Sequence, residues 1–271
     1  MTTRTAKHRV SRRRVAALLA AALTAASGWT APAALAQPAP VIAAASDLKF
    51  ALDEIADQFS ARTGQRVRIS YGSSGNFFRQ IQQGAPFELF LSADEAFVFE
   101  LARSGHAIDD GIQYAIGRIV LFSPRGSPVA PDAQMDDLRA AIGDGRLKRF
   151  AIANPEHAPY GRAAREALQH RQLWDAVAPM LVLGENVSQA AQFAASGSAQ
   201  AGIFALSLAL APAFAGAGQH VLIPEQWHEP LRQRMALTRR ATPTARAFYD
   251  HLGSADARRV FVRYGFTLPG E

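Results

Sequence analysis

Val41-Ile42-Ala43-Ala44-Ala45-Ser46-Asp47-Leu48 is a short apolar run that ends in small and hydroxyl residues, after which an amphipathic helical stretch begins at once. A continuous apolar run of this kind is typical of a buried parallel strand. Apolar residues at positions 48, 52, 55, 56 and 59 then recur at helical spacing. The same order of strand, small or hydroxyl residues and helix recurs at 67–74, 150–160 and 181–187. This alternation predicts an α/β fold built on mostly parallel sheets.

Each of these four segments delivers the N-terminus of a helix. The first backbone N–H groups of a helix have no intrahelical partner, and the helix dipole favours negative charge there. Several such ends that converge on one point bind an oxyanion without any charged side chain. The pattern therefore predicts an anion site, although each hydroxyl taken alone is equally explained as a cap of its own helix.

The chain is predicted to cross between two α/β lobes twice. Ile119–Phe122 leads into a loop rich in proline and glycine and marks the first crossing, and Arg234–Thr238 returns the chain to the first lobe. The predicted lobes are therefore residues 37–118 plus 232–271, and residues 119–231. Ligands of α/β sheets bind outside the carboxyl ends of the strands, so we expect the ligand in the cleft between the lobes.

Residues 1–36 are predicted to be a secretory signal peptide. Six basic residues precede the apolar run Val15–Ala26, and Ala34-Leu35-Ala36 offers a cleavage site before Gln37. The apolar run is too short for a stable membrane anchor. Ser11-Arg12-Arg13 is similar to a twin-arginine signal, but the residues after it fit that signal poorly, which favours the general secretory route. The mature chain is expected in the periplasm.

The charge balance argues against several classes of partner. The full chain has 29 basic and 23 acidic residues, and loss of the six basic residues in the leader leaves 23 of each. A mature chain without net charge gives no electrostatic reason to bind nucleic acid or an anionic membrane. The absence of cysteine excludes disulfides, thiolate metal sites and a lipid-modified N-terminal cysteine. We expect a monomer of two small domains.

The sequence offers little for an enzyme. An exported hydrolase could use Ser74 or His157, but residues 72–76 have Asn76 where a nucleophile elbow requires its second glycine. A lone histidine in a loop, such as His157 beside Glu156, is more often structural, and no histidine shows metal-ligand spacing. We therefore expect no catalysis, no cofactor and no metal cation held by side chains.

Six segments span nearly all of the mature chain and carry a family resemblance: AAAS (43–46), YGSSGNFFRQI (71–81), GAPFELFLSAD (84–94), NPEHAPYG (154–161), GENV (184–187) and FVRYGF (261–266). On these residues the chain resembles the periplasmic molybdate-binding proteins of ABC transporters. The resemblance implies a type II periplasmic binding fold with molybdate or tungstate between its lobes. It also implies a membrane permease and a cytoplasmic ATPase as partners.

The resemblance further implies a set of anion contacts: hydroxyl and main-chain donors from Ser46 and Ser74, N–H groups from Tyr160 and Val187, and additional contacts at Asp47, Gly75 and Asn186. One position departs from the family. Many relatives place a tyrosine donor after the strand at 201–204, where this chain has Ala205. We hypothesise that the ring hydroxyl of Tyr160 replaces that donor.

A pocket made only of donors suits molybdate, tungstate and sulfate, which are dianions near neutral pH. Monohydrogen phosphate carries a proton that needs an acceptor, and such a buried mismatch costs about 1–3 kcal/mol. Sulfate has the same charge and a smaller radius, so only the size of the cavity rejects it. A receptor for sulfate or another tetrahedral oxyanion is therefore the alternative within this fold.

Overall fold

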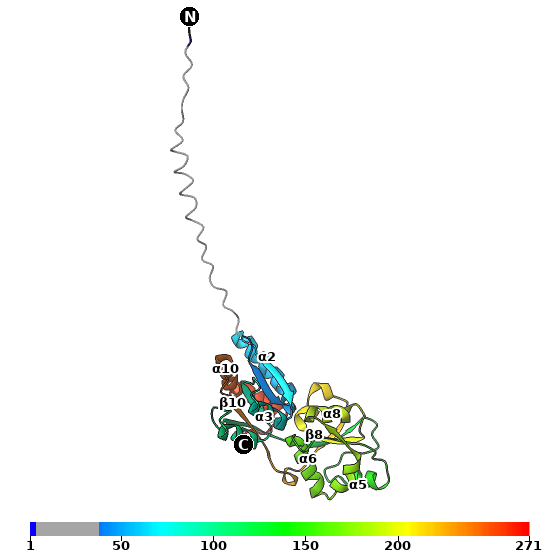
Figure 1. Ribbon diagram of the computed structural model, residues 1–271. Coiled ribbons are helices and arrows are strands. Elements are labelled where there is room, and N and C mark those ends of the chain that lie inside the picture. Colours follow the sequence, from blue (N-terminus) through cyan, green and yellow to red (C-terminus); the bar gives the residue numbers. More distant parts are fainter. Residues whose placement is uncertain (4–37, 271) are drawn as a thin grey trace. The chain divides into compact units, whose positions relative to one another are not determined.

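The computed structural model describes residues 1–3 and 38–270. The predicted signal peptide lies, apart from Met1–Thr3, outside the described residues. Within them the chain forms two five-stranded sheets, each flanked by helices (Figure 1). We refer to each sheet with its helices as a lobe.

The first sheet has the spatial order β2-β1-β3-β10-β4. Its strands are β1 (Val41–Ala45), β2 (Arg68–Gly72), β3 (Leu89–Ser92), β4 (Ile112–Gly117) and β10 (Leu231–Leu237). Its helices are η1 (Ser46–Leu48), α2 (Lys49–Thr63), α3 (Ser74–Gln82), α4 (Glu95–Arg103), α10 (Pro243–Leu252) and α11 (Ala255–Arg263). The last helix is capped by Ser254, because its hydroxyl accepts from the Ala257 N–H.

The second sheet has the order β7-β6-β8-β5-β9. Its strands are β5 (Ile119–Pro124), β6 (Phe150–Ala153), β7 (Leu181–Gly184), β8 (Ala201–Ala205) and β9 (Gly218–Leu222). Its helices are α5 (Asp136–Gly143), α6 (Pro159–His170), α7 (Trp174–Val177), η2 (Ala178–Met180), α8 (Val187–Ala195), α9 (Leu206–Ala209) and η3 (Pro212–Phe214), and η4 (Glu225–Trp227) lies on the return path.

The sheets are mixed rather than mostly parallel. In the first, β1 pairs in parallel with β2 and β3, whereas β10 pairs antiparallel with β3 and β4. In the second, β6 pairs in parallel with β7 and β8, whereas β5 pairs antiparallel with β8 and β9. The strands β5 and β10 each follow a crossing between the lobes, so they enter their sheets from the opposite end.

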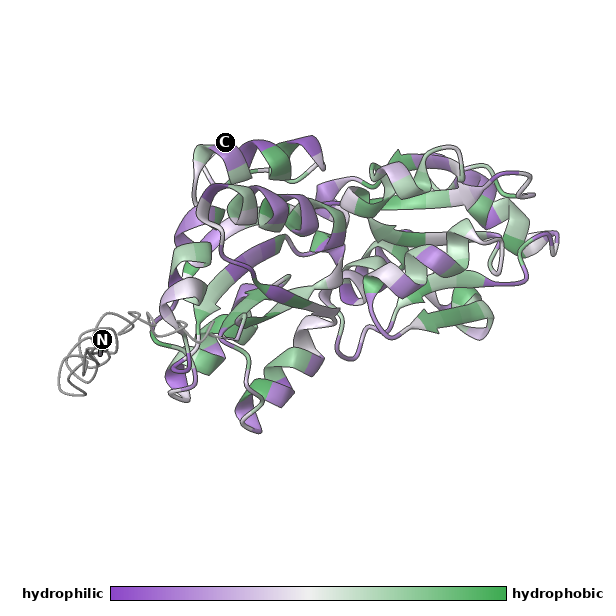
Figure 2. Cartoon of the chain, turned by 90° about the horizontal axis from the view of Figure 1, so that it is seen from above, coloured by the Kyte–Doolittle hydropathy of each residue, from purple (hydrophilic) through white to green (hydrophobic). Residues whose placement is uncertain are grey.

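Both faces of the first sheet are buried. Ile42 and Ala44 pack with α2, α10 and α11 on one face, and Ala43 packs with α3 and α4 on the other. The second sheet has its own core around Phe122, Phe150 and Phe204. Figure 2 shows the hydrophobic residues concentrated on the strands and on the inward sides of the helices. This double burial explains why the parallel strands read as continuous apolar runs.

Candidate functional site

A small cavity lies where the carboxyl ends of the parallel strands of both sheets meet. Ten residues line it: Ala45, Ser46, Gly72, Ser73, Ser74, Ala93, Ala158, Pro159, Tyr160 and Val187. None of these lining residues carries a charge, and the first six come from the first lobe and the last four from the second. The structure therefore brings Ser46, Ser74, Tyr160 and Val187 together around one point.

At the start of α3, two of the first three N–H groups have partners. The Asn76 N–H donates to the hydroxyl of the capping residue Ser73 at 3.4 Å. The Gly75 N–H donates across the cleft to the His157 carbonyl at 3.0 Å. The remaining N–H, that of Ser74, belongs to the first helical residue and has no intrahelical acceptor. It is therefore free to face the cavity that Ser74 lines.

The start of α8 follows the same scheme. The side chain of the capping residue Asn186 accepts from the Gln189 N–H at 3.1 Å. The Ser188 N–H donates to the hydroxyl of Ser46, in the other lobe, at 3.2 Å. The first helical residue, Val187, again keeps an N–H without an intrahelical acceptor.

The start of α6 reaches the same result without a side-chain cap. Its N-cap residue is Ala158, and Pro159 at the first helical position has no N–H to satisfy. The N–H groups of Gly161 and Arg162 both donate to the Ala158 carbonyl, at 2.9 and 3.0 Å. Tyr160 lies between Pro159 and Gly161, and its N–H is the one that remains without an intrahelical acceptor at this helix end.

The two predicted hydroxyl donors differ. The Ser74 hydroxyl accepts from the Ala93 N–H at 2.9 Å and keeps its own hydrogen for the cavity. The Ser46 hydroxyl donates to the Asn186 side-chain oxygen at 3.0 Å, so its hydrogen is already used between the lobes. Both serines are almost fully buried. In this closed arrangement Ser74 is the better side-chain donor to a ligand.

The ring hydroxyl of Tyr160 points away from the role that we hypothesised for it. It donates to the Asp47 carboxylate at 3.0 Å and accepts from the Gln233 side-chain amide at 3.0 Å. Gln233 also donates to Asp47 at 2.6 Å and accepts from the Tyr114 hydroxyl at 2.7 Å. Burial raises the pKa of Asp47 to about 6, although the hydrogen bonds from Gln233 and Tyr160 act in the opposite direction.

Asp47, Gly75 and Asn186 do not line the cavity. The Asp47 side chain lies in the buried network with Tyr160, the Gly75 N–H is taken by His157, and the Asn186 side chain caps α8 while it accepts from Ser46. All three hold the lobes together around the cavity. Ala205 ends β8 and is fully buried, and it too is absent from the lining.

His157 contacts Ser73 rather than Ser74. Its Nδ1 lies 2.8 Å from the Ser73 hydroxyl, and its Nε2 lies 3.6 Å from the Glu185 carboxylate. Sequence reasoning did not select Ala93 or Gln233, and it did not pair Ser73 with His157. A signal for Gln233 existed, because Leu231, Gln233 and Met235 alternate with two arginines in β10 and all three are buried.

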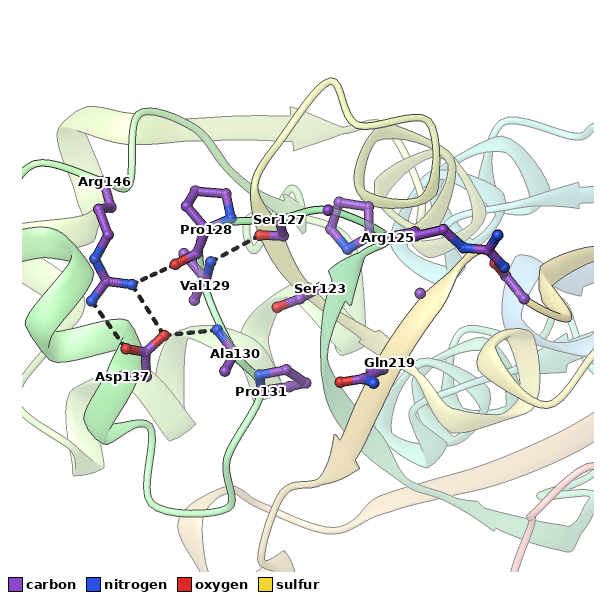
Figure 3. A pocket seen from close by; sticks show the side chains of 14 residues that line it. Ser123, Arg125, Ser127, Pro128, Val129, Ala130, Pro131, Asp137, Arg146 and Gln219 are labelled. Carbon is purple, nitrogen blue, oxygen red and sulfur yellow. Dashed lines mark hydrogen bonds and ion pairs between the residues drawn. The ribbon is translucent and has the colours of Figure 1, made fainter.

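A larger cavity, of about 590 Å³, lies in the second lobe beside the loop that follows β5 (Figure 3). Its arginines are already engaged. Arg146 pairs with Asp137 at 3.0 Å and Asp144 at 2.7 Å, and Arg125 donates to the Gly216 carbonyl at 2.8 Å. The starts of α3, α6 and α8 do not reach this cavity, so it lacks the donors that those helix ends supply.

Other kinds of site receive no support from the described residues. Among residues 1–3 and 38–270 no group of three or more histidine, aspartate or glutamate side chains is placed to hold a metal ion. The same residues include no helix with the length and apolar character needed to cross a membrane.

Comparison with known proteins identifies the family. Residues 40–267 match the model of the family described as "Bacterial extracellular solute-binding protein". The molybdate-binding protein ModA of Azotobacter vinelandii is 36% identical over 240 residues, which cover 87% of this chain and 93% of that protein. ModA of Rhodobacter capsulatus is 34% identical over 251 residues, which cover 92% and 95%.

A solved structure agrees with the sequence relatives. The structure of the Azotobacter vinelandii periplasmic molybdate-binding protein superimposes with a TM-score of 0.77 and 32% identity, and the match covers 85% of this chain and 99% of that one. The fold expected from the sequence is thereby confirmed. The chain belongs to the bacterial extracellular solute-binding protein family and, within it, to the family of the ModA molybdate-binding proteins.

Proposed function

We propose that this protein captures molybdate or tungstate between its two lobes and delivers it to an ABC transporter. The supporting observation is the cavity of neutral donors, in which the starts of α3, α6 and α8 each leave one N–H and Ser74 adds a hydroxyl. A tetrahedral dianion matches donors that converge from several directions. The names and coverage of the ModA relatives favour molybdate over other dianions.

The proposed ligand contacts are the hydroxyl and N–H of Ser74, the N–H groups of Tyr160 and Val187, and the main chain of Ser46. In this proposal the lobes comprise residues 37–118 plus 232–271, and residues 119–231, and they close as units around the ion. Asp47, Gly75 and Asn186 then act between the lobes rather than on the ligand.

The wider setting is part of the same proposal. Residues 1–36 direct export and are removed, so the mature protein works as a monomer in the periplasm. Its partners are a membrane permease that recognises the closed form and the ATPase that drives the permease. A relative named as a putative ABC transporter substrate-binding lipoprotein, from Bacillus subtilis, supports the transporter partner at 30% identity over 83% of this chain.

Calorimetric titration of the mature protein with molybdate, tungstate, sulfate and phosphate tests the proposal. We expect tight binding of the first two and weak or no binding of the others. Saturation at one hundred times the dissociation constant stabilises the folded state by about 2.7 kcal/mol, which raises the melting temperature by several degrees. A protein that neither releases heat nor gains melting temperature in millimolar molybdate or tungstate contradicts the proposal, and preference for sulfate supports the alternative receptor.

A further inference from the structure

One buried polar cluster next to the cavity is not explained by ligand contacts. Asp47, Tyr114, Tyr160 and Gln233 are all at most 5% exposed, and they come from η1, β4, α6 and β10. Tyr160 belongs to the second lobe and the other three to the first. The hydrogen bond that Tyr160 donates to Asp47 and the one that it accepts from Gln233 therefore exist only while the lobes are closed.

We propose that Tyr160, Asp47 and Gln233 form an interlobe clasp that positions the main chain of Tyr160 for the oxyanion, and that Asp47 takes up a proton from solvent as the dianion binds. The inference rests on the proposed function of the cavity. Tyr160 connects the two events, because it lines the cavity and its hydroxyl donates to the Asp47 carboxylate.

The space that the clasp needs is provided by a glycine at the point where the chain crosses from the first lobe to the second. Gly117 ends β4, directly before the chain enters the second lobe. A Cβ at this position would lie 2.2 Å from the Tyr160 hydroxyl and 2.9 Å from the Gln233 amide nitrogen. Only glycine leaves room for the hydroxyl to reach Asp47, so the clasp and the crossing depend on each other.

The proton uptake follows from electrostatics. Asp47 is next to Ser46 in the chain, and its carboxylate is buried beside a cavity that is proposed to receive two negative charges. One oxygen, Oδ2, accepts two hydrogen bonds, whereas Oδ1 is buried and has no partner among the described residues. A like charge in a poorly screened region raises the pKa of a carboxyl further, and burial has already raised it to about 6.

Among the described residues, no cation is a cause of the pKa shift of Asp47 that would offset this effect. The titratable groups that face it are the hydroxyls of Tyr114 and Tyr160, whose pKa values burial raises well above the ordinary value, so both stay neutral. The helices α8 and α9, which pack on η1, carry no titratable residue. The helix α2 brings Lys49 and Asp53, which pair with each other at 2.7 Å.

The test measures protons and affinity together. Titration of the mature protein with molybdate, in buffers of different ionisation enthalpy between about pH 6 and 8, gives the number of protons taken up per ion. We expect a fractional uptake that is largest between the pKa values of Asp47 in the free and the bound protein and declines at higher pH, while affinity falls as pH rises. In Asp47→Asn the uptake disappears and the affinity no longer follows pH, whereas Asp53→Asn behaves like the native protein.

A tyrosine pair tests the clasp itself. Tyr160→Phe is expected to weaken molybdate binding by about tenfold or more, because a hydrogen bond to a carboxylate across the lobes is lost. The matched control is Tyr71→Phe, which removes a hydrogen bond of 2.6 Å from a tyrosine to Asp53 within the first lobe and is expected to leave affinity unchanged.

The outcomes separate this inference from the function on which it rests. If the native protein binds none of the oxyanions, the proposed function fails. If it binds molybdate without net proton uptake, or if Tyr160→Phe binds as tightly as Tyr71→Phe, the clasp is wrong and the proposed function stands. The number of protons that the native protein takes up per molybdate ion tests the inference even if Asp47→Asn does not fold.

Discussion

The two lobes have the same sheet design but offer the cavity different groups. In both, three parallel strands run toward the cleft and an antiparallel strand joins them after a crossing. The first lobe presents Ser46, Ser73 and Ser74, whereas the second presents only apolar or aromatic side chains and relies on main-chain N–H groups. A donor of the first lobe can therefore be removed by replacing a serine, whereas a donor of the second lobe can be removed only by changing the backbone.

The largest expected effect comes from the backbone contact between the lobes. A Cβ on Gly75 would lie 2.6 Å from the His157 carbonyl oxygen, so Gly75→Ala prevents full closure. Overpacking of this kind costs about 3 kcal/mol at its upper range, which corresponds to about a hundredfold loss of molybdate affinity. Gly143→Ala is the control, because a Cβ there meets no atom within 4 Å. Equal affinities of the two variants in a titration contradict the closed geometry.

The next largest effect is expected from removing the side-chain donor of the first lobe. Ser74→Ala deletes the hydroxyl proposed to bind the ion and leaves the Ala93 N–H without its acceptor. A hydrogen bond to a charged group contributes about 1.5–3 kcal/mol, so we expect affinity to fall by about thirtyfold. Binding by calorimetry, compared with Ser104→Ala at an exposed helix end, checks this prediction. An unaffected Ser74→Ala excludes the hydroxyl from the site.

The corresponding change in the second lobe must remove an N–H. Val187→Pro does so at the first position of α8, where proline is well tolerated by a helix. We expect about tenfold weaker binding with the helix retained, as judged by circular dichroism. Val187→Ala keeps the N–H and is expected to bind nearly as the native protein does. If alanine is as harmful as proline, the side chain rather than the backbone carries the contact.

The smallest effect is expected at the rim of the cleft. Arg162 in the second lobe pairs with Asp94 in the first at 2.7 Å, but the arginine side chain is 37% exposed. Solvent-exposed ion pairs contribute about 0.2–1 kcal/mol, so Arg162→Ala should weaken binding by about twofold. Raising the salt concentration should reduce the difference between this variant and the native protein. A loss as large as that of Ser74→Ala shows that the rim, and not the cavity, governs affinity.

Much of the fold was accessible from the sequence because its decisive segments are local. The strand and helix of 41–63 are found where the apolar run and the helical periodicity predict them. The strand β4 was missed because Ile112–Gly117 mixes buried and exposed residues and gains its pairing from β10, far along the chain. The helix α5 was missed because it follows directly on a proline-rich loop. The antiparallel entry of β5 and β10 depends on the path between the lobes, which no local pattern encodes.

The hydrogen bonds of the site were harder to predict from the sequence, because they also depend on residues far apart in the chain. Helix starts can be read from small and hydroxyl residues, and the family resemblance implied that Ser46, Ser74, Tyr160 and Val187 contact one ion; all four line the cavity. Where each hydroxyl points depends on the other lobe. Asn186 draws the Ser46 hydrogen away, and Asp47 draws that of Tyr160, across 140 and 113 positions of sequence.

The Asn186 side chain offers a way to detect whether the two lobes are open or closed. Its oxygen accepts from Gln189 within its helix and from Ser46 across the cleft, so opening removes one of two bonds while the helix cap survives. An isotope-labelled amide at this single position would therefore shift its vibrational or magnetic resonance frequency on opening without any change in secondary structure. One native side chain could thus serve as an intrinsic probe of lobe closure, with no dye or label attached to the surface.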